Sequence, residues 1–401
     1  MFLLLISPSL SHAQSSCGTD EIHEFQMKTD SEYRRLHLQQ NDAIRTIIQN
    51  KENARGAADE TVYTIPVVVH VVHLGEDVGT GSNISDHQIR EAIRGLNERY
   101  RNIRGDGEDI RLEFCLATQD PNGLPTNGIN RVDGSGVKNY EQYGIGGSCD
   151  GTSASETAIK NLSRWPVLKY YNIWVVHKIC GGWAGYAYYP NGFAFDGAVM
   201  LRHYMTYSSS TLAHELGHGF NLAHTFNGDD GNRFCPPNKN CATQGDYVCD
   251  TPPHKQNECG ISSTCSTEGD WDNSRFNYMS YCSKKTRFTQ GQKDRIRATL
   301  SVYPRANLLK SSGCKSIINN SIVLKDISNL SGTICHSNQL KPVIKVENTG
   351  ANVIDSIRIA YTLNGKNEKI IAWTGTISQN EEVSIQLPKL EEVIGENVLD
   401  V

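Results

Sequence analysis

The stretch HELGHGFNLAH, at residues 214–224, places three histidines and a glutamate close together in the sequence. An α-helix turns by about 100° per residue, so His214 and His218 lie one turn apart on the same face. Both imidazoles can therefore bind one ion at roughly 2 Å, as zinc prefers. Glu215 lies beside the first imidazole, where it can take a proton from a water that attacks a carbonyl. The spacing predicts a zinc hydrolase site with Glu215 as general base.

The third histidine fits this site only if the helix ends before it. On a continuous helix His224 would point about 240° away from His218. A chain reversal needs a residue at positive φ, usually glycine, and the sequence has Asn221 at the expected point. Asparagine is the next most tolerant residue in that conformation. We therefore predict a reversal at Asn221 and three histidine ligands; the alternative is a helix with three structural histidines.

The elements that must position this stretch alternate between strands and helices. Residues 62–73, VYTIPVVVHVVH, form a β-branched run typical of a buried strand. Residues 84–102 are predicted as an amphipathic helix with a capping box of Ser85 and Gln88. Further strands are predicted at 110–117, 170–177, 185–190 and 196–205. The pattern indicates an α+β catalytic domain over residues 61–312.

The N-terminal sequence indicates export. Residues 1–13 combine a short apolar run with Ser-His-Ala, which is typical of a signal peptide; a buried N-terminal strand is the alternative. Residues 14–60 are polar and end in KENARGAADE, which resembles a cleavable linker, so we interpret them as a propeptide. Within it, residues 32–56 are compatible with a helix or with an irregular chain.

The C-terminal sequence, residues 315–401, alternates short strands with Asn-Gly and Thr-Gly turn signals. This rhythm predicts a small immunoglobulin-like β-sandwich. The pattern stops in mid-strand at ENVLDV, so either the last strand is short or the domain is incomplete.

Composition restricts the partners and the compartment. The net charge of −5 argues against nucleic acid as a partner, and we find no apolar run of about 18 residues that could span a membrane. Twelve cysteines favour an oxidising compartment. Disulfides are expected among the six that lie in one loop-rich stretch, namely Cys235, Cys241, Cys249, Cys259, Cys265 and Cys282.

The histidine stretch resembles the extended zinc motif of the metzincins, H-E-x-x-H-x-x-G-x-x-H. NYMSY, at 277–281, resembles their methionine turn, and IPVVVHVVH, GYAYYP and CDTPP resemble landmarks of the pappalysin family in its bacterial cytophagalysin and ulilysin-like branch. The resemblance covers about residues 61–300. It implies a secreted zinc endopeptidase with a mixed sheet and helices above a cleft and an irregular, disulfide-rich subdomain below it.

The resemblance also implies roles for single residues. His214, His218 and His224 would be the zinc ligands, and Glu215 the general base and acid. Met279 would lie beneath the metal, and Tyr281 would bind the metal or stabilise the oxyanion. Asn221 departs from the family's glycine.

A cysteine near the N-terminus suggests a zymogen. In this family a cysteine segment such as SCGTDE can place a thiolate on the zinc, which would make Cys17 the switch. If Cys115 is then a buried free thiol, an even number of cysteines remains for disulfides. The alternative, which the sequence does not exclude, is that Cys17 pairs elsewhere or has no role.

The loop GDYVCDTPP places Asp246, Asp250 and Thr251 where relatives bind calcium through oxygen ligands. Solvated loop acids are an equal alternative. Some relatives prefer a basic residue after the cleaved bond, through an acidic pocket beyond the methionine turn. Here that stretch is YCSKKTRFT, without an acid, so we do not expect the basic preference.

The sequence therefore favours a zinc metalloendopeptidase that acts on protein or peptide substrates. The alternative is a surface-binding or adhesive protein with a vestigial protease domain. In that case the C-terminal domain would bind a surface or carbohydrate ligand, which fold alone cannot identify.

Overall fold

The computed structural model describes residues 17–54, 60–103, 105–146, 151–266, 268–315, 320–329, 341–350, 352–378, 381–390 and 398–401. The predicted signal peptide and linker residues 55–59 lie outside this part. The chain divides into two compact units, residues 1–121 with 126–314 and residues 122–125 with 315–401.

The first unit is built on a six-stranded sheet of order β2-β1-β4-β6-β5, in which β3 also pairs with β1. The strands are β1 (Tyr63–His73), β2 (Leu112–Leu116), β3 (Ile129–Asp133), β4 (Tyr171–Val176), β5 (Gly185–Ala187) and β6 (Ala198–Leu201). Each predicted strand is present, and β3 is an addition. All pairings are parallel except that of β5, which runs antiparallel to β6 at the edge of the sheet.

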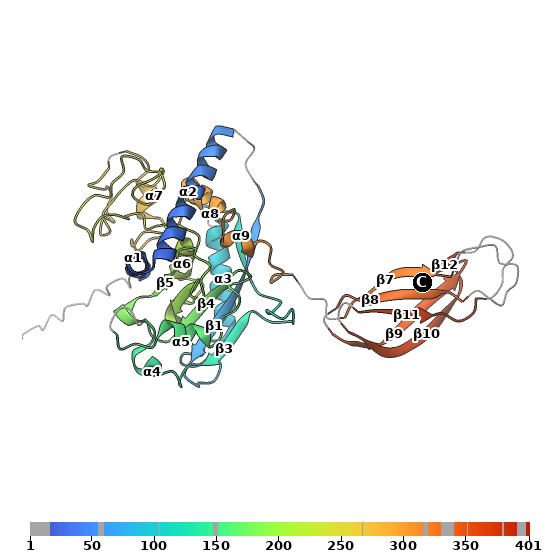
Figure 1. Ribbon diagram of the computed structural model, residues 1–401. Coiled ribbons are helices and arrows are strands. Elements are labelled where there is room, and N and C mark those ends of the chain that lie inside the picture. Colours follow the sequence, from blue (N-terminus) through green and yellow to red (C-terminus); the bar gives the residue numbers. More distant parts are fainter. Residues whose placement is uncertain are drawn as a thin grey trace, which may run out of the picture. The chain divides into compact units, whose positions relative to one another are not determined.

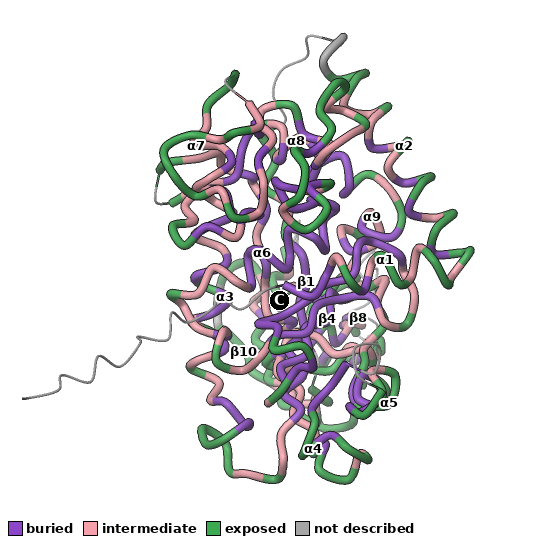
Figure 2. Tube along the Cα trace, turned by 90° about the vertical axis from the view of Figure 1, so that its left-hand side faces the viewer, coloured by how far each residue is buried: buried purple, intermediate pink, exposed green. Residues whose placement is uncertain are grey.

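Three helices accompany the sheet: α3 (Asp86–Tyr100), α6 (Thr211–Gly219) and α8 (Gln290–Thr299). Figure 2 shows the buried part of the trace concentrated around β1, β4 and α6. The capping box predicted for α3 is half wrong. Ser85 Oγ accepts from the Gln88 N–H at 3.1 Å, but the Gln88 side chain donates to the carbonyls of Arg202 and Met205. These two hydrogen bonds connect α3 to the segment before α6.

The shorter helices are α4 (Tyr140–Tyr143), α5 (Glu156–Asn161), α7 (Asp272–Arg275) and α9 (Arg305–Leu308), with 3₁₀ turns at Cys180–Gly182 and Arg202–Tyr204. The described part of the polar N-terminal segment forms two helices, α1 (Thr19–Thr29) and α2 (Ser31–Ala54). Helix α2 runs beside α8 (Figure 1), where Lys51 pairs with Asp294 at 2.6 Å. Residues 32–54 are therefore helical, one of the two alternatives that the sequence left open.

Disulfides link the cysteine-rich loops as expected, through Cys235–Cys265, Cys241–Cys249 and Cys259–Cys282. The interpretation of Cys115 as a free thiol is wrong, because it is bonded to Cys314. Side chains alternate along β2, so Leu112 and Phe114 face the core while Cys115 faces the other side and is half-buried. Cys115 lies next to Phe114 in LEFCL, which is why the prediction wrongly placed it in the core too.

The second unit contains two antiparallel three-stranded sheets, β11-β8-β7 and β10-β9-β12. The strands are β7 (Ile322–Ser328), β8 (Val343–Asn348), β9 (Ile354–Leu363), β10 (Lys366–Ile377), β11 (Glu382–Gln386) and β12 (Leu399–Asp400). One apolar cluster takes side chains from both sheets. An immunoglobulin-like topology stays a prediction. Among the described helices of the whole chain, none combines the length and apolar character needed to cross a membrane.

Candidate active site and metal centre

The chain reverses at Asn221. Helix α6 ends at Gly219, and Asn221 has a φ of +72°. The N–H of Leu222 donates to the Gly217 carbonyl and that of Asn221 to the His218 carbonyl, both at 2.9 Å. This pair of bonds is the Schellman motif that commonly ends helices with a glycine. The predicted reversal is confirmed.

The structure gives a reason for asparagine at this turn. Arg295, fully buried on α8, donates through Nε to the Asn221 carbonyl at 2.7 Å and through Nη2 to Asn221 Oδ1 at 2.6 Å. A glycine would satisfy the backbone conformation but would leave one guanidinium N–H without this acceptor. Asn221 therefore connects the C-terminal end of α6 to α8 through hydrogen bonds with Arg295.

We expect Asn221→Ala to be worse than Asn221→Gly. Glycine removes only the acceptor for Arg295, which lowers the free energy of unfolding by roughly 1.5–3 kcal/mol. Alanine adds the penalty of a left-handed conformation, about 1–2 kcal/mol. Urea unfolding of the zinc-free variants measures both. Equal losses for the two substitutions would show that the left-handed turn is not the constraint.

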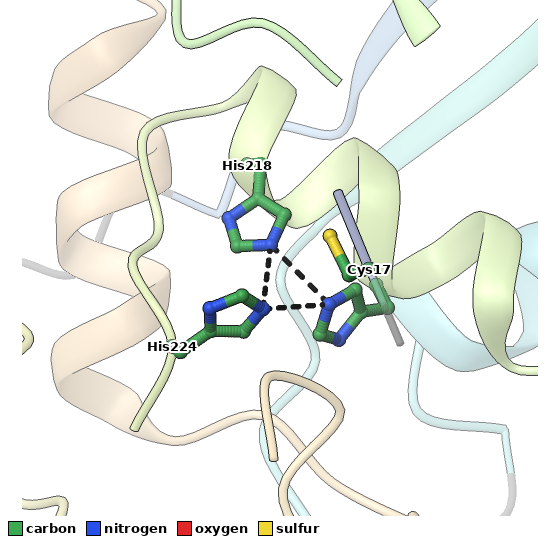
Figure 3. Close-up of side chains that lie close together, drawn as sticks. Cys17, His218 and His224 are labelled. Carbon is green, nitrogen blue, oxygen red and sulfur yellow. Dashed lines mark hydrogen bonds between the residues drawn. The ribbon is translucent and has the colours of Figure 1, made fainter. Parts of the chain in front are cut away.

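Three imidazoles converge beyond this turn. The Nε2 atoms of His214, His218 and His224 lie 3.1–3.2 Å from one another, and all three side chains are buried. The Cys17 Sγ joins them, so that four potential ligand atoms lie within 4.8 Å of one another. In Figure 3 the rings of His218 and His224 direct a nitrogen toward each other, and the sulfur of Cys17 lies close to the cluster.

The hydrogen bonds made by the outer ring nitrogens, Nδ1, determine whether the inner nitrogens, Nε2, carry a proton. Each Nδ1 lies beside an oxygen: His214 at 2.7 Å from the Tyr278 carbonyl, His218 at 2.8 Å from the Leu222 carbonyl, and His224 at 2.7 Å from Asp20 Oδ2. Because each oxygen accepts a hydrogen bond, each Nδ1 carries the proton and each Nε2 presents a lone pair. Lone pairs that face one another need a cation between them, so these residues fit a zinc ion.

Glu215 lies fully buried beside this cluster. Its Oε2 accepts from the Cys17 thiol at 3.2 Å and from Thr19 Oγ1 at 3.4 Å. Its Oε1 has no hydrogen-bond partner among the described residues. Burial raises the pKa of Glu215 to about 8. One carboxylate oxygen is thus free to bind a reactant such as water.

Met279 packs beneath the histidine helix. It is fully buried, and a Cβ on Gly217 would lie 2.3 Å from its Sδ, so the absence of a side chain at Gly217 permits the contact. The Met279 carbonyl accepts from the N–H of Thr225, next to the third histidine. Met279 therefore contacts the histidine helix at Gly217 and the residue that follows the third histidine.

Tyr281 lies at the edge of the cluster, with its ring 4.8 Å from that of His224. Its hydroxyl is 3.2 Å from both the N–H and the carbonyl oxygen of Cys17. Burial raises the pKa of this phenol, so it carries its proton. The hydroxyl can therefore donate to a carbonyl oxygen that lies beside the cluster.

The N-terminal segment extends the sheet at its edge. Cys17 pairs in parallel with Gly185 of β5, and the N–H of Gly18 donates to the Gly185 carbonyl at 3.0 Å. The N–H of Ala187 donates to Thr19 Oγ1 at 3.0 Å. Edge strands commonly bind an extended peptide in this way. Here the peptide is a segment of the chain itself, and it covers the cluster.

The predicted calcium residues all have protein partners. Asp246 accepts from Thr251 Oγ1 at 2.6 Å, and Asp250 accepts from Thr289 Oγ1 at 2.7 Å and from the N–H of Gly291 at 2.9 Å. Asp250 therefore satisfies donors at the start of α8. The calcium site stays a prediction.

Sequence reasoning missed Thr19, Asp20 and Lys285 at this site. Thr19 and Asp20 follow the predicted switch cysteine, which was the available signal, but nothing local indicated the glutamate and histidine they would meet. Lys285 is half-buried, and its positive charge lowers the pKa of Glu215 against the larger effect of burial. The only sequence signal for its place at the site was its position just after the methionine turn.

Comparison with known proteins identifies the family of this chain. The family model described as pregnancy-associated plasma protein-A, peptidase family M43, matches residues 153–301. An extracellular metalloprotease of Neurospora crassa is 33% identical over 325 residues, which cover 76% of this chain and 97% of the relative. The chain belongs to the pappalysin family of extracellular metalloproteases. It is an extracellular metalloendopeptidase, and its substrates are peptides or proteins.

Three further similarities support the assignment. An extracellular metalloprotease of Sordaria macrospora is 26% identical, with 76% of this chain and 97% of the relative covered. A solved mutant of Tannerella forsythia promirolysin has a TM-score of 0.53 and 26% identity, covering 74% of this chain and 97% of its own. The structure of mature mirolysin with a cleaved peptide has a TM-score of 0.50 and 28% identity, covering 63% and 97%. The fold is thus a mixed α+β metzincin-like protease fold with disulfides.

Proposed function

We propose that this pappalysin is a zinc endopeptidase made as a zymogen, with His214, His218 and His224 as zinc ligands and Glu215 as general base. The convergence of three imidazole Nε2 atoms beside a buried carboxylate carries the proposal. The zinc would supply a Lewis acid that acidifies water and polarises the scissile carbonyl.

Glu215 does the proton transfer. Its free Oε1 accepts a proton from the attacking water and returns it to the leaving amine. Tyr281 donates a hydrogen bond to the substrate oxygen as it gains negative charge, from the position where its hydroxyl now meets the backbone of Cys17. Met279 packs against the histidine helix at Gly217 and supports it.

The edge strand β5 aligns the substrate. The carbonyl of Gly185 and the N–H of Ala187 bind the N-terminal segment in the present structure. In the active enzyme an extended substrate would take these same hydrogen bonds. Mature mirolysin is known with a cleaved peptide, which supports a peptide-binding cleft in this family.

Cys17 acts as the zymogen switch. Its Sγ lies with the three imidazole nitrogens, where a thiolate would occupy the place of the reacting water. Thr19 and Cys17 also both bind Glu215, so the base is engaged as well. The similarity to promirolysin supports a propeptide at residues 14–60, after a signal peptide at 1–13 and before a catalytic domain at 61–312.

The finer assignments rest on fewer contacts. The positive charge of Lys285 acts on Glu215, and Lys285 belongs to the stretch where some relatives would carry an acidic pocket, so we propose that a basic side chain is not preferred there. The immunoglobulin-like domain at 315–401, its surface or carbohydrate ligand, and the calcium site stay predictions.

Cleavage of a mixed peptide library tests the proposed function. The full chain is assayed before and after limited proteolysis between α2 and β1, with and without a zinc chelator. We expect cleavage only after proteolysis, complete loss with the chelator, and recovery when zinc is added back. A shortened chain that binds zinc but cleaves nothing would contradict the proposal and favour the adhesive alternative.

A further inference from the structure

The outer hydrogen bonds of the three histidines do not have the same origin. His214 and His218 donate to backbone carbonyls of Tyr278 and Leu222, which belong to the proposed catalytic domain. His224 instead donates to Asp20 Oδ2 at 2.7 Å, and Asp20 is the second residue of α1. The third ligand thus obtains its outer partner from the N-terminal segment.

A carboxylate that accepts from Nδ1 of His224 also affects how strongly this imidazole binds a metal ion. A partner on the outer nitrogen fixes the tautomer of a metal-binding imidazole and makes the inner nitrogen a stronger ligand. An ionised acceptor forms a stronger hydrogen bond than a neutral one. His224 is also the ligand that lies beyond the helix, so the rigid turns of α6 do not hold it as they hold His214 and His218.

The same segment supports the turn that carries His224. Asn41 of α2 accepts a hydrogen bond through Oδ1 from Nη2 of Arg295. Arg295 in turn binds the carbonyl and side chain of Asn221. The N-terminal segment therefore contacts the third-ligand loop at two points, one at the imidazole and one through a buried arginine.

We infer that Asp20 is a positioning residue for zinc, through which the N-terminal segment raises the affinity of the zymogen for its metal. This rests on the zinc site of the proposed function. It is separate from the blocking role of Cys17, because it acts through the outer nitrogen of His224. Loss of the segment on activation would leave that nitrogen to water, so the zymogen would hold zinc more tightly than the active enzyme.

Zinc titration of the full chain in competition with a chelating dye tests the inference. Every variant carries Cys17→Ala, so that the thiol does not contribute to affinity. We expect Asp20→Ala to weaken zinc binding roughly 10–100-fold. Asp20→Asn, which keeps a neutral acceptor of the same shape, should fall between this value and that of the parent. Glu24→Ala is the matched control, since Glu24 is exposed on the same helix and pairs with Lys28; it should not change the affinity.

The outcomes separate the two proposals. An Asp20→Ala chain that binds one zinc as tightly as its parent would overturn the inference and leave the proposed function intact. A parent chain that binds no zinc would overturn both. If Asn and Ala give the same loss, the effect is one of docking α1 rather than of the hydrogen bond, and the positioning role is wrong.

Discussion

After removal of its N-terminal segment, the Glu215→Gln chain is expected to cleave peptides about 10²–10⁴-fold more slowly than the wild type. Glutamine keeps the shape of the side chain but cannot take the proton of the attacking water. The substitution leaves the three histidines in place, so zinc content should stay at one per chain, as in the shortened wild type. The measurements are kcat/KM on a peptide substrate and metal analysis of the same sample.

Glu91→Gln is the control for this variant. Glu91 lies on α3, away from the histidine cluster, and pairs with Arg94. It should retain both activity and zinc. A Glu215→Gln enzyme with wild-type activity would show that another group is the base. A variant that loses its zinc would show that Glu215 acts on the metal site itself.

The second large effect concerns stability. Arg305 of α9 forms two hydrogen bonds with Asp196, at 2.7 and 2.9 Å, and both side chains are almost fully buried. Its Nε donates to the carbonyl of Gly219, the last residue of α6. Arg305→Met leaves the Asp196 carboxylate buried without its ion-pair partner, which should lower the free energy of unfolding by about 3–5 kcal/mol. The histidine helix would lose its anchor at the same time.

Urea unfolding of the wild type and three variants measures this effect. Arg233→Met removes an exposed pair with Asp230 and should cost less than about 1 kcal/mol. Asp196→Asn combined with Arg305→Met removes the buried charge and should recover part of the loss of the single Arg305 variant. If Arg305→Met is no more harmful than Arg233→Met, the buried pair does not hold the end of α6.

The local parts of the site could be predicted from the sequence. Helical periodicity alone places His214, Glu215 and His218 together, and the tolerance of asparagine for positive φ predicts the turn at Asn221. The strand at 62–73 could be predicted because β-branched side chains lose rotamer freedom in a helix and pack well on a pleated sheet. Each of these features depends on residues that are neighbours in the sequence, so local sequence patterns predict it.

The remaining parts depend on residues that are distant in the chain. Asp20 meets His224 across 204 positions, and Arg295 reaches Asn221 across 74. No local pattern encodes such pairs. The same reason explains the error at Cys115, whose partner is 199 positions away. The Gln88 side chain likewise donates to the carbonyls of Arg202 and Met205, which are distant in the sequence, and not to the predicted capping box.

The position of the metal can be measured in a crystal of the full chain grown with zinc, with anomalous data collected at the zinc absorption edge. We expect one strong peak at roughly 2.0–2.1 Å from the Nε2 atoms of His214, His218 and His224. A helix that continues through Asn221, with His224 far from any zinc peak, would contradict the proposed metal centre.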